Sequence, residues 1–144
     1  MGQLVLILGK SGSGKSTSLR NFGPDEVGVF NVASKRLPFR SQIPTADGAG
    51  YDTIIRTLKA NKRRAYIIDD ATYLMSFDNF NRSSEGGYGK FVDMAKSFYD
   101  LIKAALATDA DTITYLLMHP ELDALGHEKP RTVGKMLDEK LCIE

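Results

Sequence analysis

Three short apolar runs, each ending at a glycine or a polar residue, most constrain how this chain of 144 residues can fold. They cover residues 4–8, 66–68 and 112–118, and the residues that follow them are Gly9, Asp69 and His119. Between these runs, apolar residues recur at every third or fourth position, a spacing typical of amphipathic helices. Because parallel strands need long crossover connections, this alternation predicts an α/β fold with a mainly parallel sheet.

The hydrophobic pattern and the positions of glycine and proline predict the boundaries of the elements. Residues 89–108 give the strongest helix prediction, because their apolar side chains form one continuous stripe. The first run has the character of a strand buried on both faces. We expect strands at 4–8, 27–33, 66–68 and 112–118, helices at 14–22, 51–61 and 89–108, loops at 34–50 and 71–89, and turns or a short hairpin in 121–144.

The composition fits one soluble globular domain spanning residues 1–144. Hydrophobic residues make up 42% and charged residues 26%, and the formal net charge is +1, so bulk charge does not indicate a nucleic-acid or membrane partner. The single cysteine, Cys142, rules out an intramolecular disulfide and fits a reducing compartment. The start of the chain lacks a basic leader, and no apolar run approaches the roughly 20 residues that span a bilayer. We therefore expect a cytoplasmic protein without membrane contact.

The segment after the first apolar run matches G-x-x-x-x-G-K-[ST] at every fixed position. A flexible glycine-serine turn could match by chance, but the position between a strand and an expected helix favours a phosphate-binding loop. Glycines let successive N–H groups point at phosphate oxygens, and a helix N-terminus adds positive potential. Lys15 is expected to reach the β- and γ-phosphates, and Ser16 to ligate Mg²⁺. The expected nucleotide-binding residues are Gly9, Lys10, Ser11, Gly12, Ser13, Gly14, Lys15, Ser16 and Thr17.

Polar residues at the ends of the other two runs supply candidate catalytic groups. Asp69 is expected to hold Mg²⁺ through water, as the acid at the end of a neighbouring strand. Asp70 could polarise the attacking water, or be a surface aspartate that caps a helix. His119 could contact the γ-phosphate or that water, or merely close its strand. Since ligands of parallel sheets bind beyond the carboxyl ends of the strands, these residues, the glycine loop and residues 33–34 should converge.

Two further sets of side chains have both a functional and an ordinary explanation. Aromatic and basic residues of 71–89 could bind single-stranded nucleic acid by stacking, or pack beneath the loop as a small core; they are Tyr73, Phe77, Phe80, Arg82 and Tyr88. Arg131 and Lys135 could reach the γ-phosphate of a neighbouring subunit, or be solvated cations.

Four segments together resemble phage-encoded ATP-binding proteins of the RecA-like/AAA P-loop group, including those associated with single-strand annealing and recombination. The segments are "LILGKSGSGKSTSLRNF", "AYIIDDATYLM", "TITYLLMHPE" and "PRTVGKMLDEKLCIE". The resemblance implies a three-layer α/β/α sandwich with a P-loop NTPase core, in which the strand ending at His119 lies between those ending at Gly9 and Asp69. It also implies Mg²⁺-dependent ATP hydrolysis, coupled to DNA handling by a homo-oligomer in the host cytoplasm.

The sequence departs from this group in two respects. RecA-like enzymes place a catalytic glutamate after the second strand, whereas "VFNVASKR" has none, which leaves Asp70 to substitute. Such cores also continue into further strands, so we expect either a domain truncated at its C-terminus or a sheet edge covered by a partner.

Three functional classes therefore stay open. The first is an ATPase acting in phage DNA recombination or replication. The second is a small-molecule kinase, since "GKSGSGKST" also resembles the loops of sugar and nucleoside kinases, with Lys35 and Arg36 available to a substrate. The third is an ATP-binding switch with little turnover. The absence of an Asn-Lys-x-Asp motif favours adenine over guanine.

Overall fold

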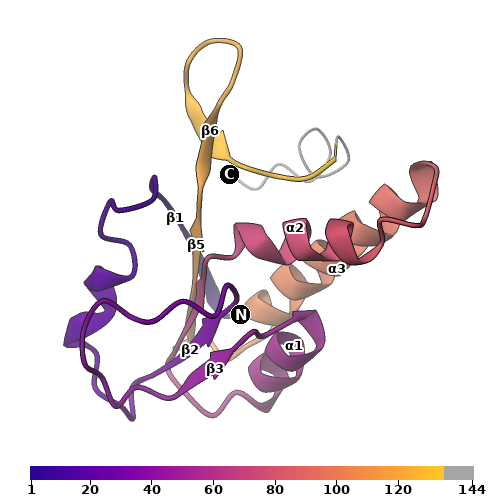
Figure 1. Cartoon of the computed structure of the whole chain (residues 1–144). Coiled ribbons are helices and arrows are strands. Elements are labelled where there is room, and N and C mark those ends of the chain that lie inside the picture. Colours follow the sequence, from indigo (N-terminus) through magenta and orange to yellow (C-terminus); the bar gives the residue numbers. More distant parts are fainter. Residues whose placement is uncertain (135–144) are drawn as a thin grey trace.

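The computed structural model describes residues 1–134 and shows an α/β fold built on a five-stranded parallel sheet (Figure 1). Lys135 and Cys142 lie outside the described residues. In chain order the elements are β1 (Gln3–Leu8), the 3-10 helix η1 (Thr17–Asn21), β2 (Val27–Asn31), β3 (Thr45–Asp47), α1 (Tyr51–Ala60), β4 (Ala65–Asp69), α2 (Thr72–Asn81), α3 (Tyr88–Leu106), β5 (Ile113–Met118), β6 (Pro120–Leu122) and β7 (Glu128–Pro130).

The strand order in the sheet is β1-β5-β4-β2-β3. β5 thus lies between β1 and β4, the order that the resemblance implied. β1 and β5 run in register from Gln3 beside Ile113 to Leu8 beside Met118. This register brings the carboxyl ends of these two strands to the same edge of the sheet, where their following loops meet.

β1 is an edge strand, as the expected strand order implied when no further strand follows, but its exposed and half-buried residues correct the expectation of a strand buried on both faces. It pairs with β5 on one side only, and no other strand among residues 1–134 pairs with it. Its residues are exposed or half-buried, and Val5 is 36% exposed. An apolar run alone cannot distinguish an edge strand from a central one, because that depends on which neighbours pair with it.

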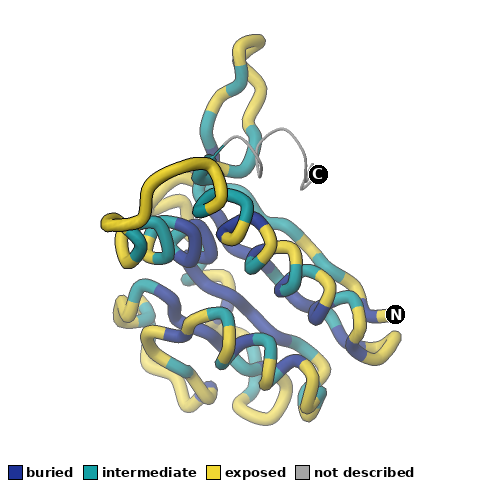
Figure 2. The backbone as a smooth tube through the Cα atoms, turned by 90° about the vertical axis from the view of Figure 1, so that its right-hand side faces the viewer, coloured by how far each residue is buried: buried dark blue, intermediate teal, exposed yellow. Residues whose placement is uncertain are grey.

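Helices α1, α2 and α3 contribute to the larger core cluster on one face of the sheet, where Ile54, Leu58, Met75, Phe98 and Leu101 are almost fully buried. Figure 2 shows the buried stretches along the central strands and on the inner sides of the helices. The other face packs against η1 and the segment that follows β2, through Leu19 and Ile43, with Leu37 and Phe39 beside them. Among residues 1–134, this second layer therefore contains no α-helix.

The structure differs most from the sequence prediction in three segments, and β2 also ends at Asn31, two residues before the expected end. The expected helix at 14–22 is reduced to η1, because the loop before it extends through Ser16 and the chain leaves helical geometry at Phe22. Residues 71–89 are not one long loop, since α2 occupies 72–81 and buries Leu74 and Met75. The serine and glycine pairs mark only the α2–α3 connection. β3, in the predicted loop 34–50, is a three-residue strand that forms by pairing with β2.

A hairpin follows β5 and projects from the sheet (Figure 1). β6 and β7 pair antiparallel, and the Asp123 carboxylate accepts hydrogen bonds from the backbone N–H groups of Leu125 (2.8 Å) and His127 (2.9 Å). The prediction of a short hairpin in this part of the chain is confirmed. Within residues 1–134, no helix has both the length and the apolar character needed to cross a membrane.

Candidate functional site

An open pocket of about 260 Å³ lies where the loops after β1, β2, β4 and β5 meet. The predicted convergence is confirmed for the glycine loop, Asp69, Asp70 and His119, whereas the segment after β2 contributes residues 35, 36 and 38 and not the expected residues 33–34. The pocket is lined by Ser11, Gly12, Gly14, Lys15, Ser16, Thr17, Lys35, Arg36, Pro38, Asp69, Asp70 and His119. Three lysine and arginine side chains and two carboxylates therefore share one small hollow with the glycine loop.

Backbone geometry explains the glycines of the loop. Gly12 and Gly14 have φ angles of +78° and +94°, which L-residues with a side chain rarely adopt. A Cβ atom on Gly9 would lie 2.4 Å from Ser13 Oγ and 3.1 Å from Lys15 Cγ. The Lys15 ammonium donates hydrogen bonds to the Gly9 carbonyl and, at 3.1 Å, to the Lys10 carbonyl. The loop thus curls around its own lysine, which holds that charge at the pocket.

The helix that follows the loop is shorter than the sequence prediction required. η1 has five residues, beginning at Thr17, and Ser16 precedes it in right-handed helical geometry. A helix dipole grows from many aligned peptide units. The contribution of a helix N-terminus, which the sequence analysis added to the loop, is therefore small, and the positive potential comes chiefly from Lys15 and its neighbouring cations.

Ser16 and Asp69, 53 positions apart in the chain, meet at the floor of the pocket. The Ser16 hydroxyl donates to Asp69 Oδ2 at 2.8 Å, whereas Asp69 Oδ1 is buried without a hydrogen-bond partner among the described residues. Burial raises the pKa of Asp69, and the Ser16 hydrogen bond opposes this shift only in part. A hydroxyl beside an incompletely satisfied carboxylate is the oxygen donor set that Mg²⁺ takes in nucleotide sites, with phosphates and water completing its shell. The residues present therefore fit a magnesium ion.

Asp70 is held in an unusual backbone conformation and paired with a lysine. Its φ angle is +56°, and its carboxylate lies 3.2 Å from the Lys35 ammonium. The same ammonium lies 5.1 Å from the centre of the Tyr73 ring. Burial by itself lowers the pKa of Lys35, but the hydrogen bond and charge of Asp70 outweigh it and leave this pKa above its ordinary value. Asp70 therefore stands at the pocket as predicted, but as half of an ion pair.

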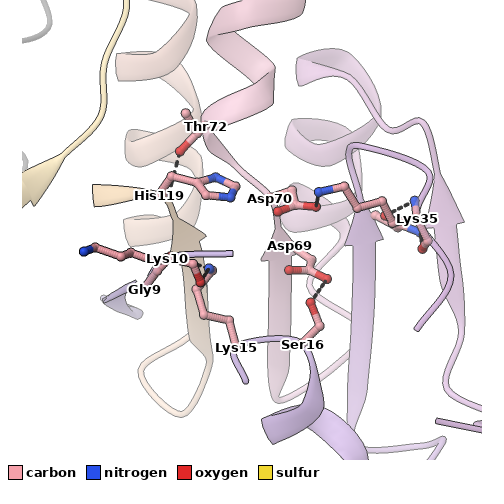
Figure 3. Close-up of polar contacts among 10 residues, drawn as sticks. Gly9, Lys10, Lys15, Ser16, Lys35, Asp69, Asp70, Thr72 and His119 are labelled. Atoms are coloured by element: carbon pink, nitrogen blue, oxygen red, sulfur yellow. Dashed lines mark hydrogen bonds and ion pairs between the residues drawn. The ribbon is translucent and has the colours of Figure 1, made fainter. Parts of the chain in front are cut away.

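His119 approaches the pocket from the opposite side, so that Asp70 lies between His119 and Lys35 in Figure 3. Its backbone N–H donates to Thr72 Oγ1 at 3.0 Å, and its ring meets the edge of Tyr73 at 5.8 Å between centroids. Burial, followed by the charge of Lys15, lowers the pKa of His119. At neutral pH the imidazole is therefore uncharged and has both a donor and an acceptor nitrogen.

The aromatic and basic residues of 71–89 do not form one surface. Tyr73 contacts two residues that line the pocket, Lys35 and His119. Phe77, Phe80 and Tyr88 are 45%, 78% and 66% exposed. The Arg82 guanidinium lies 3.1 to 3.9 Å from the carboxylates of Asp78, Glu85 and Asp93. Because these three groups neutralise its charge, Arg82 is poorly placed to bind a phosphate of a nucleic acid.

The other cations considered in the sequence lie at different places. Arg131 is exposed, and its backbone N–H donates to the His119 carbonyl at 2.9 Å, which puts it beside the site of its own chain. Lys135 lies outside the described residues. Lys35 and Arg36, expected from the sequence to contact only a kinase substrate, both line the pocket. Their position directly after the second strand was the available signal, since loops at that edge carry ligand contacts.

The scan against protein-family models found none that matches this chain. The search among curated proteins also found no match.

Proposed function

We propose that this chain is a Mg²⁺-dependent ATP-binding protein with a P-loop NTPase core of the RecA-like kind, in which η1 and the segment after β2 stand in the place of the second helical layer of an α/β/α sandwich. The observation that carries the proposal is the meeting of Lys15, Ser16 and Asp69 in one pocket, with the Ser16 hydroxyl bonded to Asp69. In this arrangement the glycine loop and Lys15 bind the phosphates. Ser16 and, through water, Asp69 would hold Mg²⁺, which when bound neutralises phosphate charge.

We further propose that the protein hydrolyses ATP in phage DNA recombination or replication, as a homo-oligomer that contacts single-stranded DNA. Asp70 would accept a proton from the attacking water once it is free of Lys35, and neutral His119 would orient that water. The support for DNA handling is the sequence resemblance together with the exposed rings of Phe80 and Tyr88. The support for an oligomer is the outer edge of β1, with which no strand among residues 1–134 pairs and which can pair with another chain.

A small-molecule kinase is the second candidate, and one observation favours it. A second hollow of about 320 Å³ adjoins the first and shares Lys35 and Arg36 with it. Its other lining residues include Asn31 and Asp47, whose side chains hydrogen-bond to each other at 2.9 Å. A hydroxyl-bearing acceptor bound there would lie next to the phosphate pocket.

Binding of ATP with Mg²⁺, measured by titration calorimetry, tests the shared part of both proposals. Loss of the Lys15 ammonium removes a charge-assisted contact, so Lys15→Ala should weaken binding by about tenfold to a hundredfold. Lys59→Ala removes an exposed lysine of α1 and is the matched control, with no expected change. Absence of ATP binding by the unaltered protein would refute the proposal.

Turnover separates the functional classes. Hydrolysis stimulated by single-stranded DNA, and lost in both Lys15→Ala and Asp70→Asn, supports the ATPase. Hydrolysis or transfer that requires a small hydroxyl compound supports the kinase. Binding of ATP without turnover in either assay supports a nucleotide-binding switch.

A further inference from the structure

The backbone of Lys35 is held more firmly than that of an ordinary surface lysine. Asn31, the last residue of β2 and 3% exposed, accepts a hydrogen bond from the Lys35 N–H at 3.2 Å and donates to the Lys35 carbonyl. Asn31 is also the register partner of Asp69 in the sheet. One buried side chain therefore fixes the position of the Lys35 backbone, just beyond the end of β2 and beside the end of β4, where Asp69 and Asp70 lie.

The side chain of Lys35, in contrast, is largely exposed to solvent. It is 55% exposed, whereas the Asp70 side chain with which it pairs is only 11% exposed and sits on a left-handed backbone. A lysine reaches its partners through a flexible four-carbon stem. If the ion pair opens, Lys35 is consequently the partner that moves, while its backbone and Asp70 stay in place.

A terminal phosphate would compete with Asp70 for this ammonium. Lys35 lines the same pocket as Lys15, Ser16 and His119, and it is close enough to His119 to influence its pKa. A phosphate group offers more negative charge and more acceptor oxygens than one carboxylate. Lys15 already occupies the centre of the glycine loop, so Lys35 reaches the pocket from the side of β2 and β4.

We propose that Lys35 distinguishes a nucleoside triphosphate from a diphosphate, by leaving Asp70 and binding the terminal phosphate. The proposal rests on the nucleotide-binding function proposed above. In the free protein Lys35 neutralises Asp70. With a triphosphate in the pocket, Lys35 binds the phosphate and the Asp70 carboxylate becomes available to water. A diphosphate lacks the group that draws Lys35 away, so the ion pair persists.

The test compares affinities for a non-hydrolysable ATP analogue and for ADP, both with Mg²⁺, by titration calorimetry. Lys35→Met keeps the apolar stem beside Tyr73 and removes the charge. We expect it to weaken binding of the analogue by about tenfold and to leave ADP affinity within about twofold. Lys35→Arg keeps the charge and should keep the preference for the analogue. Lys59→Met on α1 is the matched control.

The effect of Lys35→Met on binding of the analogue, measured again in the Asp70→Asn variant, decides whether Lys35 contacts the phosphate. Asp70→Asn releases Lys35 from its partner, so it should tighten binding of the analogue. Lys35→Met should still weaken that binding by about tenfold in this background. If the effect of Lys35→Met disappears there, Lys35 acts only by neutralising Asp70 and the proposal is overturned.

Other outcomes are equally decisive. Equal weakening of analogue and ADP, or no effect of Lys35→Met on either, overturns the role of Lys35 and leaves the nucleotide site standing. Failure of the unaltered protein to bind either nucleotide refutes the proposed function, and the role of Lys35 with it. Circular dichroism of each variant verifies that it is folded, and Lys35→Gln, which also removes the charge, replaces Lys35→Met if that variant does not fold.

Discussion

Replacing Asp69 by asparagine should stabilise the free protein while it removes the proposed magnesium site. Asp69 is 4% exposed, its Oδ2 accepts a hydrogen bond from Ser16, and its Oδ1 is buried without a partner in the described part of the chain. A buried carboxylate in this situation loses its hydrogen bonds to water, and hydrogen bonds from the protein replace only some of them. Asparagine has nearly the same shape, can keep the bond to Ser16 and carries no charge.

The magnitude follows from the loss of a buried charge. The asparagine amide would place its NH₂ group where Oδ1 lies, so a polar group without a partner among the described residues remains and only the charge is removed. A charged group in such a position costs more than a neutral one, and we therefore expect Asp69→Asn to raise the free energy of unfolding at pH 7 by about 1 kcal/mol, and the melting temperature by roughly 2–4 °C.

The gain should depend on pH with a defined sign. Burial raises the pKa of Asp69 in the folded protein, so the unfolded chain releases this proton at lower pH. The contribution of Asp69 to stability therefore falls as pH rises from the ordinary aspartate pKa through the raised one. Below the ordinary value the carboxyl is protonated in both states, and the advantage of Asp69→Asn should vanish.

Urea unfolding of both proteins between pH 3 and pH 8, without nucleotide, measures this difference. Asp111→Asn is the matched control, because Asp111 is exposed and its replacement should change stability by less than about 0.5 kcal/mol. A correctly folded Asp69→Asn protein that is less stable than the original at pH 7 would refute the reasoning, since the carboxylate would then gain more from Ser16 and Lys15 than burial costs it.

Three further predictions concern other parts of the molecule. The lowered pKa of His119 predicts that NMR titration places its midpoint below that of an unfolded histidine, and that stability rises with pH between these two values; a midpoint at or above the unfolded value contradicts this. Phe80→Ala should weaken binding of single-stranded DNA by about 1–3 kcal/mol per lost base stack without changing ATP affinity; unchanged DNA binding excludes stacking by this ring. Gly2→Ala should destabilise the fold by about 1–3 kcal/mol in thermal unfolding, because the new Cβ would lie 2.0 Å from Thr108 Oγ1, whereas Gly86→Ala meets open space and should be near neutral; equal effects would refute the packing argument.

Several parts of the fold and of the site follow from local pattern. The apolar runs ending at Gly9, Asp69 and His119 are strands of a parallel sheet, and the stripe in α3 is a helix over nearly its predicted length. These predictions succeed because strand and helix periodicity are properties of neighbouring residues. The convergence of the strand ends also follows, since parallel strands bring their carboxyl ends to one edge.

Other features needed contacts between distant parts of the chain. α2 buries Leu74 and Met75 in the core, and β3 is a strand because it pairs with β2. The edge position of β1 reflects the strands that pair beside it. α2, β3 and the edge position of β1 all depend on contacts between distant residues, which the periodicity of neighbouring residues does not encode.

By itself, then, the sequence determined the strands, the long helix and the glycine loop that makes a phosphate site the leading hypothesis. The tertiary structure alone decided that Lys35 pairs with Asp70, that Asn31 holds the Lys35 backbone, and that one oxygen of the buried Asp69 has no hydrogen-bond partner within residues 1–134. The physical reason is that charge pairing and burial depend on distances in space. Lys35 and Asp70 are 3.2 Å apart although 34 residues separate them along the chain.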